Sequence, residues 1–445
     1  MRQYIILSIS ILFSFVLFSQ ENSYSFTVDE AVNYSLKNNY TAKNSALDVE
    51  IAEKVMTEYK AFGLPQIDGK VDYNNYLIQN ITLIPSEIVG GPPGEFEEVI
   101  FGAKQNLNAT VTLTQVIFDG AYLVALQSTK AYLKISNLSK VKTEQQIREA
   151  VINAYGSVLV AREAILILKD NIATLEKNLN ETKAYLENGF AEVQDFEQQQ
   201  ITLLNTENQL NKAVRLEIIA KKMLNLVLGI PIEIPVELKD SLEHLALSST
   251  DLNLINKSFV LDDHIDFKIA DNRVVTQELQ LKYEKSKNIP TLNAFINYST
   301  FAQNNNNIFF KNNGRWFDSS LLGVSLNIPI FSSLERKSRA QQAKMGLDQM
   351  VIELDETSEK LKLQVETARN KYQFALDQFQ TLKQNLVLAE SIAEKEQIKF
   401  FEGLSTSFNL ANAQNQLYRT QQNYIESILG IIESKVELEN ALNIY

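Results

Sequence analysis

Residues 64–73 read LPQIDGKVDY, and residues 289–298 read IPTLNAFINY. Each segment begins with an aliphatic residue and a proline, and then alternates apolar and polar side chains up to a tyrosine. A period of two is typical of a β-strand with one apolar face and one polar face. One strand pattern therefore occurs in both halves of the chain, which indicates an internal repeat.

Two further landmarks recur in the same order. Residues 111–118 (VTLTQVIF) match residues 324–331 (VSLNIPIF), and both segments alternate. The segment ENGF at residues 187–190 matches FEGL at residues 401–404. Three landmarks at nearly constant spacing predict a tandem duplication of a unit of about 200 residues.

Turn residues are scarce in this chain. Among 445 residues there are 15 glycines and 8 prolines, well below the typical shares of roughly 7% and 5%. This scarcity excludes a loop-rich protein and favours long, uninterrupted helices. Gly189 and Gly403 stand far from any proline, where each would end a long helix.

The composition also excludes several classes of function. The chain has no cysteine, which excludes disulfides, thiolate metal sites, cysteine catalysis and a lipidated N-terminal cysteine. A net charge of -12 argues against nucleic-acid binding. No phosphate loop, dinucleotide motif or zinc pattern is present. The two histidines, His244 and His264, do not have the spacing of a zinc-binding pair. We therefore expect no enzymatic activity, no metal and no cofactor.

Residues 1–20 have the pattern of a secretory signal peptide. Arg2 precedes an apolar run over residues 5–18, which is short for a membrane span of about 20 residues. We expect export and cleavage near residues 19–21. No uninterrupted apolar run of 18 residues follows, so we expect no transmembrane helix and predict that strands make any membrane crossing.

The duplicated patterns predict a domain organisation of two repeats joined by a linker. The first repeat spans residues 21–228, with strands at about 65–77 and 106–118 and long helices at about 120–188 and 191–228. An irregular linker is expected at residues 229–262. The second repeat spans residues 263–445, with strands at about 290–302 and 319–331 and long helices at about 333–402 and 405–443. Residues 80–105 and 303–314, which are rich in turn residues, are expected to be exposed loops.

The strands are long enough to cross a bilayer at a tilt. Aromatic side chains near their ends are candidates for the membrane interface: Tyr73, Tyr76, Tyr298 and Trp316. The alternative is an ordinary sheet with one solvated face. Four strands cannot close a barrel, for which about eight are needed, and lipid does not tolerate an open sheet edge. A membrane sheet would therefore need strands from other copies of the chain.

The long helices carry coiled-coil patterning. Large apolar residues recur at sevenfold spacing, namely Leu410, Leu417, Tyr424, Ile431 and Leu438. A parallel stripe three residues further on holds small side chains from Ala413 to Ala441. Such repeats predict close packing of helix on helix.

Together these features resemble the TolC-type outer-membrane efflux proteins over residues 27–445. The resemblance rests on the duplication, two strands per copy, the TVDEA start at residues 27–31, the segment FDG at residues 118–120 before a long helix, and both glycine turns. It implies a mainly α fold with a membrane β-barrel part. Four strands per chain would form a trimeric twelve-stranded barrel, continued by a long coiled-coil α-helical periplasmic tunnel.

The resemblance also implies a function. The chain would be the outer-membrane exit duct of a tripartite efflux pump or type I secretion system in a Gram-negative bacterium, conducting substrates passively. Its partners would be two further copies of itself, a periplasmic adaptor, an inner-membrane transporter and outer-membrane lipid. The alternative is a soluble periplasmic coiled-coil scaffold. A general diffusion porin is disfavoured because most of the chain is predicted to be helical.

Two sets of site residues follow from the resemblance. The adaptor would contact the glycine tips, at Gly189, Phe190, Ala191, Gly403, Leu404 and Ser405. The family narrows its tunnel with acidic side chains just after the second tip, where this sequence has Asn409 and Asn412. The first repeat carries Asp195 at the corresponding place, with Glu192 nearby, and could supply an acidic ring instead.

Overall fold

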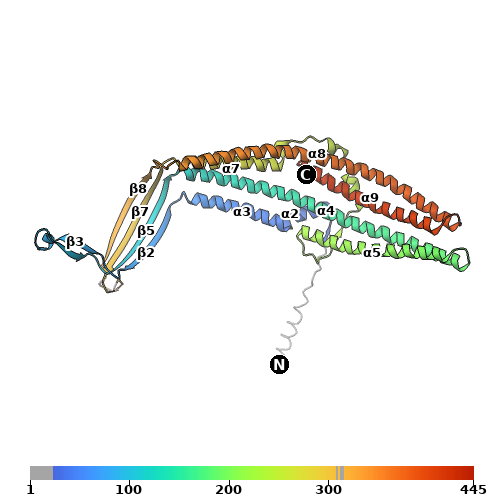
Figure 1. Cartoon of the computed structure of the whole chain (residues 1–445), viewed down its shortest axis with the longest axis horizontal. Coiled ribbons are helices and arrows are strands. Elements are labelled where there is room, and N and C mark those ends of the chain that lie inside the picture. Colours follow the sequence, from blue (N-terminus) through green and yellow to red (C-terminus); the bar gives the residue numbers. More distant parts are fainter. Residues whose placement is uncertain (1–23, 307–308, 311–314, 445) are drawn as a thin grey trace, which may run out of the picture. The chain divides into compact units, whose positions relative to one another are not determined.

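The computed structural model describes residues 24–306, 309–310 and 315–444, so the predicted signal peptide lies outside the described residues. The chain divides into two compact units, each drawing on both halves of the sequence. The helical unit comprises residues up to 48, 136–270 and from 354 onward. The strand unit comprises residues 49–135 and 271–353. Figure 1 shows the elements of both units.

The strand unit is built on a four-stranded antiparallel sheet with the order β2-β5-β7-β8. Its strands are β2 (Gln66–Asn75), β5 (Gln105–Phe118), β7 (Thr291–Asn304) and β8 (Trp316–Asn327). The two central strands come from different halves of the chain and pair with each other, so the sheet joins the two halves. Among the described residues, β2 and β8 each pair on one side only and form open edges.

The sheet has one apolar face and one polar face. Directly opposed residues in the ladder share a face, and one such row runs across all four strands through Ile67, Leu113, Ile296 and Leu322. The row three residues away from this one, on the opposite face, consists of Lys70, Thr110, Ser299 and Ser319. The apolar face is open in a single chain, and Leu322 is 72% exposed.

Two sequence expectations about strands are corrected. The fourth strand was expected at about 319–331 but runs from Trp316 to Asn327, because Pro329 has no N–H to donate to a ladder. Residues 80–105, expected to be a loop, contain a hairpin of β3 (Ile81–Pro85) and β4 (Phe96–Ile100), closed by the 3-10 helix η2 (Ser86–Val89). The hairpin strands have only five residues each, and the consecutive Glu97 and Glu98 break the alternation of apolar and polar residues.

All four helices that join the sheet meet it at the same end. These are α3 (Tyr40–Ala61), α4 (Gly120–Glu187), α7 (Ile265–Ser286) and α8 (Glu335–Phe401). Helices α3 and α7 precede the ascending strands β2 and β7, and α4 and α8 follow the descending strands β5 and β8. The β3–β4 hairpin therefore emerges from the opposite end of the sheet.

The helical unit packs parts of α4 and α8 with α2 (Val28–Asn38), α5 (Val193–Leu228) and α9 (Ser407–Ala441). Its main core gathers side chains of α4, α5 and α9: Val151, Tyr155, Val158, Leu159, Leu224, Leu228, Ile425, Ile428 and Ile432. Of the predicted heptad series on α9, Leu410, Ile431 and Leu438 are fully buried. By length and composition alone, α4 is apolar enough to cross a membrane. Only 33% of that apolar stretch is buried.

The linker between the repeats adds short elements to this unit. Strand β6 (Val236–Leu238) pairs in parallel with β1 (Tyr24–Phe26). Helix α6 (Leu242–Ser249) and the 3-10 helices η3 (Leu252–Asn256) and η4 (Leu261–Asp263) follow. The linker thus contains regular elements and lines the core through Val236, Leu242 and Leu245.

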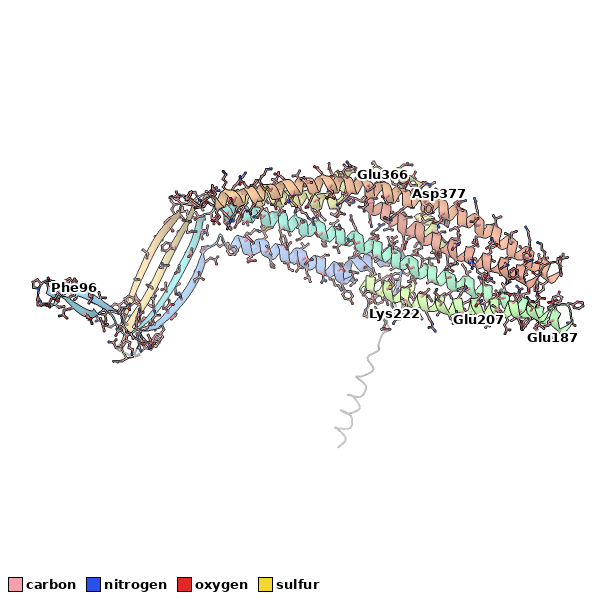
Figure 2. All side chains as sticks on the ribbon, viewed as in Figure 1. Phe96, Glu187, Glu207, Lys222, Glu366 and Asp377 are labelled. Carbon is pink, nitrogen blue, oxygen red and sulfur yellow. The ribbon has the colours of Figure 1, made fainter. Side chains whose placement is uncertain are left out.

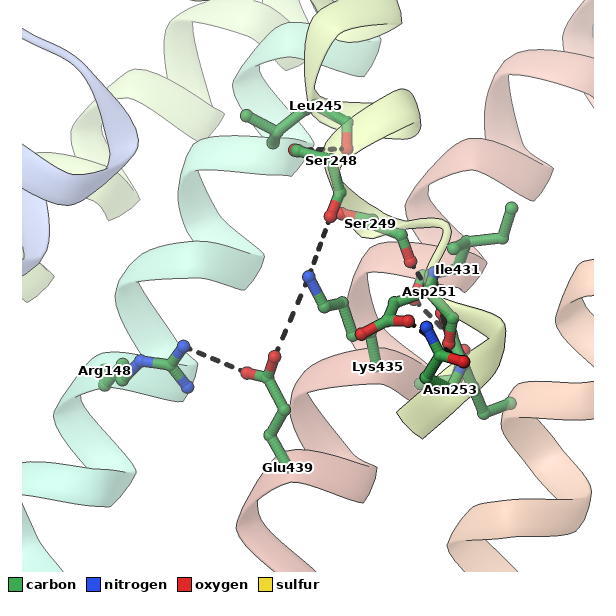
Figure 3. Close-up of polar contacts among 11 residues, drawn as sticks. Arg148, Leu245, Ser248, Ser249, Asp251, Asn253, Ile431, Lys435 and Glu439 are labelled. Carbon is green, nitrogen blue, oxygen red and sulfur yellow. Dashed lines mark hydrogen bonds and ion pairs between the residues drawn. The ribbon is translucent and has the colours of Figure 1, made fainter. Parts of the chain in front are cut away.

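Charged side chains tie α4, α9 and the linker together (Figure 3). The Arg148 guanidinium donates to Glu439 at 2.9 Å, and the Lys435 ammonium donates to the Ser248 carbonyl at 2.8 Å. Lys435 also lies 3.7 Å from Glu439. Because the Glu439 side chain is mostly buried, its two cationic neighbours offset the loss of solvation.

His264 provides a pH-dependent element of this unit. Burial, and then Lys142, lowers the pKa of His264 below its usual 6.5, whereas Asp266 opposes this shift. Its Nδ1 accepts the Asp266 N–H at 3.2 Å, which requires an unprotonated nitrogen. The unfolded chain therefore takes up a proton more readily than the folded chain as the pH falls through about 6.5.

We expect the helical unit to lose stability between about pH 7.5 and about pH 5.5, and the His264→Gln variant to lose less. Thermal unfolding at the two pH values measures the effect. An equal loss in both proteins would show that another group is responsible.

Candidate functional site

The two glycine turns each connect a pair of long helices. Helix α4 ends at Glu187 and α5 begins at Val193, while α8 ends at Phe401 and α9 begins at Ser407. Gly189 has a φ of 76° and Gly403 a φ of 74°. A left-handed backbone costs other residues about 1–2 kcal/mol, which explains glycine at both positions.

The hydrogen bonds that close each turn leave one large apolar side chain exposed to solvent. The Phe190 N–H donates to the Tyr185 carbonyl at 2.8 Å, and the Leu404 N–H donates to the Lys399 carbonyl at 2.8 Å. This six-residue closure is the Schellman motif. It leaves Phe190 80% exposed and Leu404 74% exposed. Each turn therefore presents an uncovered apolar side chain directly after its glycine.

The first turns of the next helices use equivalent capping positions. The Thr406 hydroxyl accepts the Asn409 N–H at 3.3 Å. In the other turn, Glu192 is the N-cap and its own N–H donates to the Asp195 carboxylate at 3.1 Å. Asp195 and Asn409 thus occupy the same third position of duplicated helices, and Asp195 stabilises the start of α5.

The side chain of Ser405 turns back toward its own hairpin. Its hydroxyl donates to Glu396 at 2.8 Å and accepts from the Asn409 amide at 3.3 Å. Hydrogen bonds from Lys399 and then Ser405 lower the pKa of Glu396. Of the predicted tip contacts, Gly189, Phe190, Gly403 and Leu404 are thus exposed. Ser405 braces the turn, and Ala191 is half-buried.

The structure brings the two tips together. The rings of Tyr185 and Phe401 stack with centroids 5.9 Å apart, and the Gln397 amide donates to Asn178 at 2.9 Å. Tyr185, Ile398 and Phe401 line a shallow hollow beside the tips. The sequence patterns did not identify this contact, because Tyr185 and Phe401 stand at different distances from their glycines.

The predicted constriction residues lie in the first turns after the tips. Asn409 and Asn412 are exposed and stand on one face of α9, whereas Leu410 beside them is buried. Glu192 is exposed and Asp195 is half-buried. A single chain therefore offers two amides and two carboxylates near the tip end of its helices.

Aromatic side chains gather at the hairpin end of the sheet, on its apolar face. Tyr73 is opposite Leu107, and Trp316 is opposite Ala302, all in one row. Phe309 covers this row: its ring lies edge-on to Tyr73 with centroids 6.1 Å apart, and its carbonyl accepts the Trp316 indole N–H at 3.2 Å. Tyr298 is on the same face, four residues from Ala302 toward the helix end of the sheet. Tyr76 follows the end of β2.

Neither histidine belongs to a metal-binding group. Within the described parts of the chain, no three acidic or histidine side chains lie together in an arrangement that could hold a metal. The backbone N–H of His244 donates to Ser241 at the start of α6, and His264 is buried against Phe259. His244 thus lies in the first turn of a helix, and His264 packs in the interior of the helical unit.

Comparisons with known proteins agree with this architecture. The chain is 20% identical over 421 residues to the outer membrane protein TolC of Vibrio cholerae, covering 93% of this chain and 90% of that protein. Its fold matches crystal structures of CusC (TM-score 0.73, 15% identity, 97% of this chain and 95% of that chain). It also matches the open state of the Neisseria gonorrhoeae MtrE outer membrane channel (TM-score 0.69, 14% identity, 94% and 89%). Residues 31–229 and 260–443 match the outer membrane efflux protein family, and the chain therefore belongs to that family of outer-membrane channels.

Proposed function

We propose that this chain is the outer-membrane exit duct of a tripartite efflux pump or a type I secretion system. As a member of the outer membrane efflux family, the protein resides in the outer membrane and has a large periplasmic part. The observation that carries the proposal is an antiparallel sheet with an uncovered apolar face and two open edges, joined at one end to four long helices. The duct itself supplies no energy and performs no chemistry on its cargo.

Closure of the barrel requires further copies of the chain, and the family resemblance implies three. The four strands alternate in direction, so β8 of one copy beside β2 of the next is again antiparallel. Three such pairings give a closed barrel of twelve strands and satisfy both edges, as lipid requires. Tyr73, Tyr76 and Trp316, at the hairpin end of the sheet, would mark one interface of the membrane. Tyr298 was predicted with them but lies four residues from the Trp316 row along β7, nearer the middle of the sheet.

The helical unit also carries an uncovered seam. Leu216, Ile219, Met223 and Leu226 of α5 are more than half exposed and follow a spacing of three and four residues. This is the pattern of a coiled-coil seam. A single chain leaves it open, which supports lateral packing of copies into a tunnel wall. We further propose that residues 21–228 and 263–445 are the duplicated repeats, joined by the linker at 229–262.

The function can be tested on the purified protein. We expect a homotrimer in detergent that forms channels in planar bilayers, and loss of export when the gene is deleted. A monomer without channel activity would contradict the duct, and release of the protein with the periplasmic extract would favour the scaffold alternative.

The tips are the proposed site of the periplasmic adaptor, with the inner-membrane transporter behind it. We expect Phe190→Ser combined with Leu404→Ser to reduce efflux several-fold while the trimer still assembles. The change removes the exposed apolar side chain that follows each glycine and leaves the glycines intact. Leu247→Ser, at a comparably exposed leucine on α6, is the matched control. Drug susceptibility and trimer yield are the measurements, and unchanged resistance in the double variant would exclude these contacts.

The constriction is proposed to lie at Glu192, Asp195, Asn409 and Asn412. Three copies of Asp195 would form an acidic ring, whereas Asn409 and Asn412 would form uncharged rings. We expect Asp195→Asn to lower cation selectivity in single-channel recordings, with Asn412→Ser as control. Because Asp195 also caps α5, helix content is checked by circular dichroism. An unchanged selectivity would place the constriction elsewhere.

A further inference from the structure

The β3–β4 hairpin is a separate two-stranded sheet that projects from the strand unit (Figure 1). Two hydrogen bonds close its neck: the Tyr76 N–H donates to the Lys104 carbonyl at 2.8 Å, and the Gln79 amide donates to the Gly102 carbonyl at 3.2 Å. It leaves the sheet at the end opposite the helices. Since the helices form the periplasmic part, the hairpin lies outside the cell.

One face of the hairpin carries exposed apolar side chains around a single glutamate, Glu98. Ile81 pairs with Ile100, Leu83 with Glu98, and Pro85 with Phe96. These three pairs alternate with the others along the ladder and therefore share one face. The side chains of Ile81, Leu83, Phe96 and Ile100 are all more than half exposed, and Figure 2 labels Phe96 near the end of this hairpin. An isolated two-stranded hairpin is marginally stable in water. A covering surface would remove this apolar area from water.

The charge of the hairpin indicates what that surface is. Residues 77–103 contain four glutamates, at positions 87, 95, 97 and 98, and no lysine or arginine. A second copy of the hairpin would bring like charges together, and an anionic lipid surface would repel it. A protein segment that carries lysine or arginine beside apolar side chains complements both properties.

The edges of the hairpin offer a way to hold such a segment. Among the described residues, β3 and β4 pair only with each other, so each has a free edge of backbone N–H and C=O groups. An extended peptide can add to such an edge as a further strand. We propose that the β3–β4 hairpin is the docking site of a cell-surface or secreted protein, which binds through an extended, basic and apolar segment.

The lack of cysteine makes a direct test possible, because a single introduced cysteine is the only thiol in the chain. Leu83→Cys reports on the apolar face and Thr82→Cys on the opposite face of the same strand. Intact cells of the native host and the purified trimer in detergent are treated with a membrane-impermeant maleimide. We expect Leu83→Cys to react several-fold more slowly on cells than in the purified trimer, and Thr82→Cys to react equally in both.

Two further arms address the charge. Washing the cells with concentrated salt should restore the reactivity of Leu83→Cys, because screening weakens ionic contacts. Adding Glu97→Gln and Glu98→Gln to Leu83→Cys should likewise remove its protection on unwashed cells. These results together would support a basic protein partner.

Three results would overturn the proposal. Full reactivity of Leu83→Cys on cells, equal to that of Thr82→Cys, would show that nothing covers the face. Protection that persists in the purified trimer would show that another copy of the chain covers it. Protection that survives the salt wash, and that returns when the purified trimer is placed in lipopolysaccharide vesicles, would assign the face to lipid. None of these outcomes depends on the pump that the duct serves.

Discussion

Leu322→Arg is expected to prevent the protein from assembling in the outer membrane. Leu322 lies in the middle of β8, in the apolar row shared with Ile67, Leu113 and Ile296, and is 72% exposed in the single chain. An arginine on the lipid face near the bilayer midplane costs about 2–4 kcal/mol. A trimer would bear this cost three times.

The matched control is Leu321→Arg, one residue away on the opposite face. Leu321 is also apolar and 57% exposed, but it is opposite Asn297 on the polar side of the sheet. In the proposed barrel this side faces water, so the variant should assemble. The measurement is the amount of heat-modifiable trimer in outer-membrane fractions. Normal assembly of Leu322→Arg, or equal loss in both variants, would contradict the assignment of the faces.

Tyr155→Ala is expected to destabilise the helical unit by about 3–5 kcal/mol. Tyr155 is completely buried in the middle of α4. Its hydroxyl lies 2.9 Å from the Phe26 carbonyl and 2.9 Å from the Asp240 carboxylate, and it accepts the Asp240 N–H at 3.3 Å. The substitution removes a large core side chain together with the contact that ties the β1–β6 pair to α4.

Tyr155→Phe separates the two contributions. It keeps the ring and removes only the hydroxyl, which takes away the acceptor of the Asp240 N–H at a cost of about 1–3 kcal/mol. The Phe26 carbonyl and the Asp240 carboxylate still accept from the Lys239 and Val28 N–H groups. The temperature at which trypsin cleaves the helical part of the purified protein measures both variants, and the alanine variant should be cleaved at the lower temperature. If both variants resisted trypsin as the wild type does, Tyr155 would not hold this core together.

Much of the architecture could be predicted from local patterns. Period-two alternation indicates β2, β5 and β7 within about two residues of their observed ends. The glycines at 189 and 403 indicate where the longest helices stop, because only glycine adopts a positive φ there without strain. Each of these features depends on residues that are neighbours in the sequence.

The candidate site was only partly predictable. The sequence pointed to Phe190 and Leu404, and the structure shows them to be exposed. It could not show that Ser405 braces its own hairpin, or that Asp195 accepts a hydrogen bond at the start of α5. Those roles depend on side-chain directions that are set only when the turn closes. The β3–β4 hairpin was missed because its strands are too short for a periodic pattern.

By itself the sequence determined which side of the strands of the four-stranded sheet and of the long helices is apolar, and where the long helices end, and it predicted a tandem duplication. The tertiary structure alone decided which apolar sides meet. It paired β5 of the first half with β7 of the second, placed Tyr155 against the linker residue Asp240, and stacked Tyr185 on Phe401. A periodic pattern records that one face of an element avoids water. It carries no information about which distant element covers that face, because many apolar surfaces would exclude water equally well and only the packing of the whole chain selects among them.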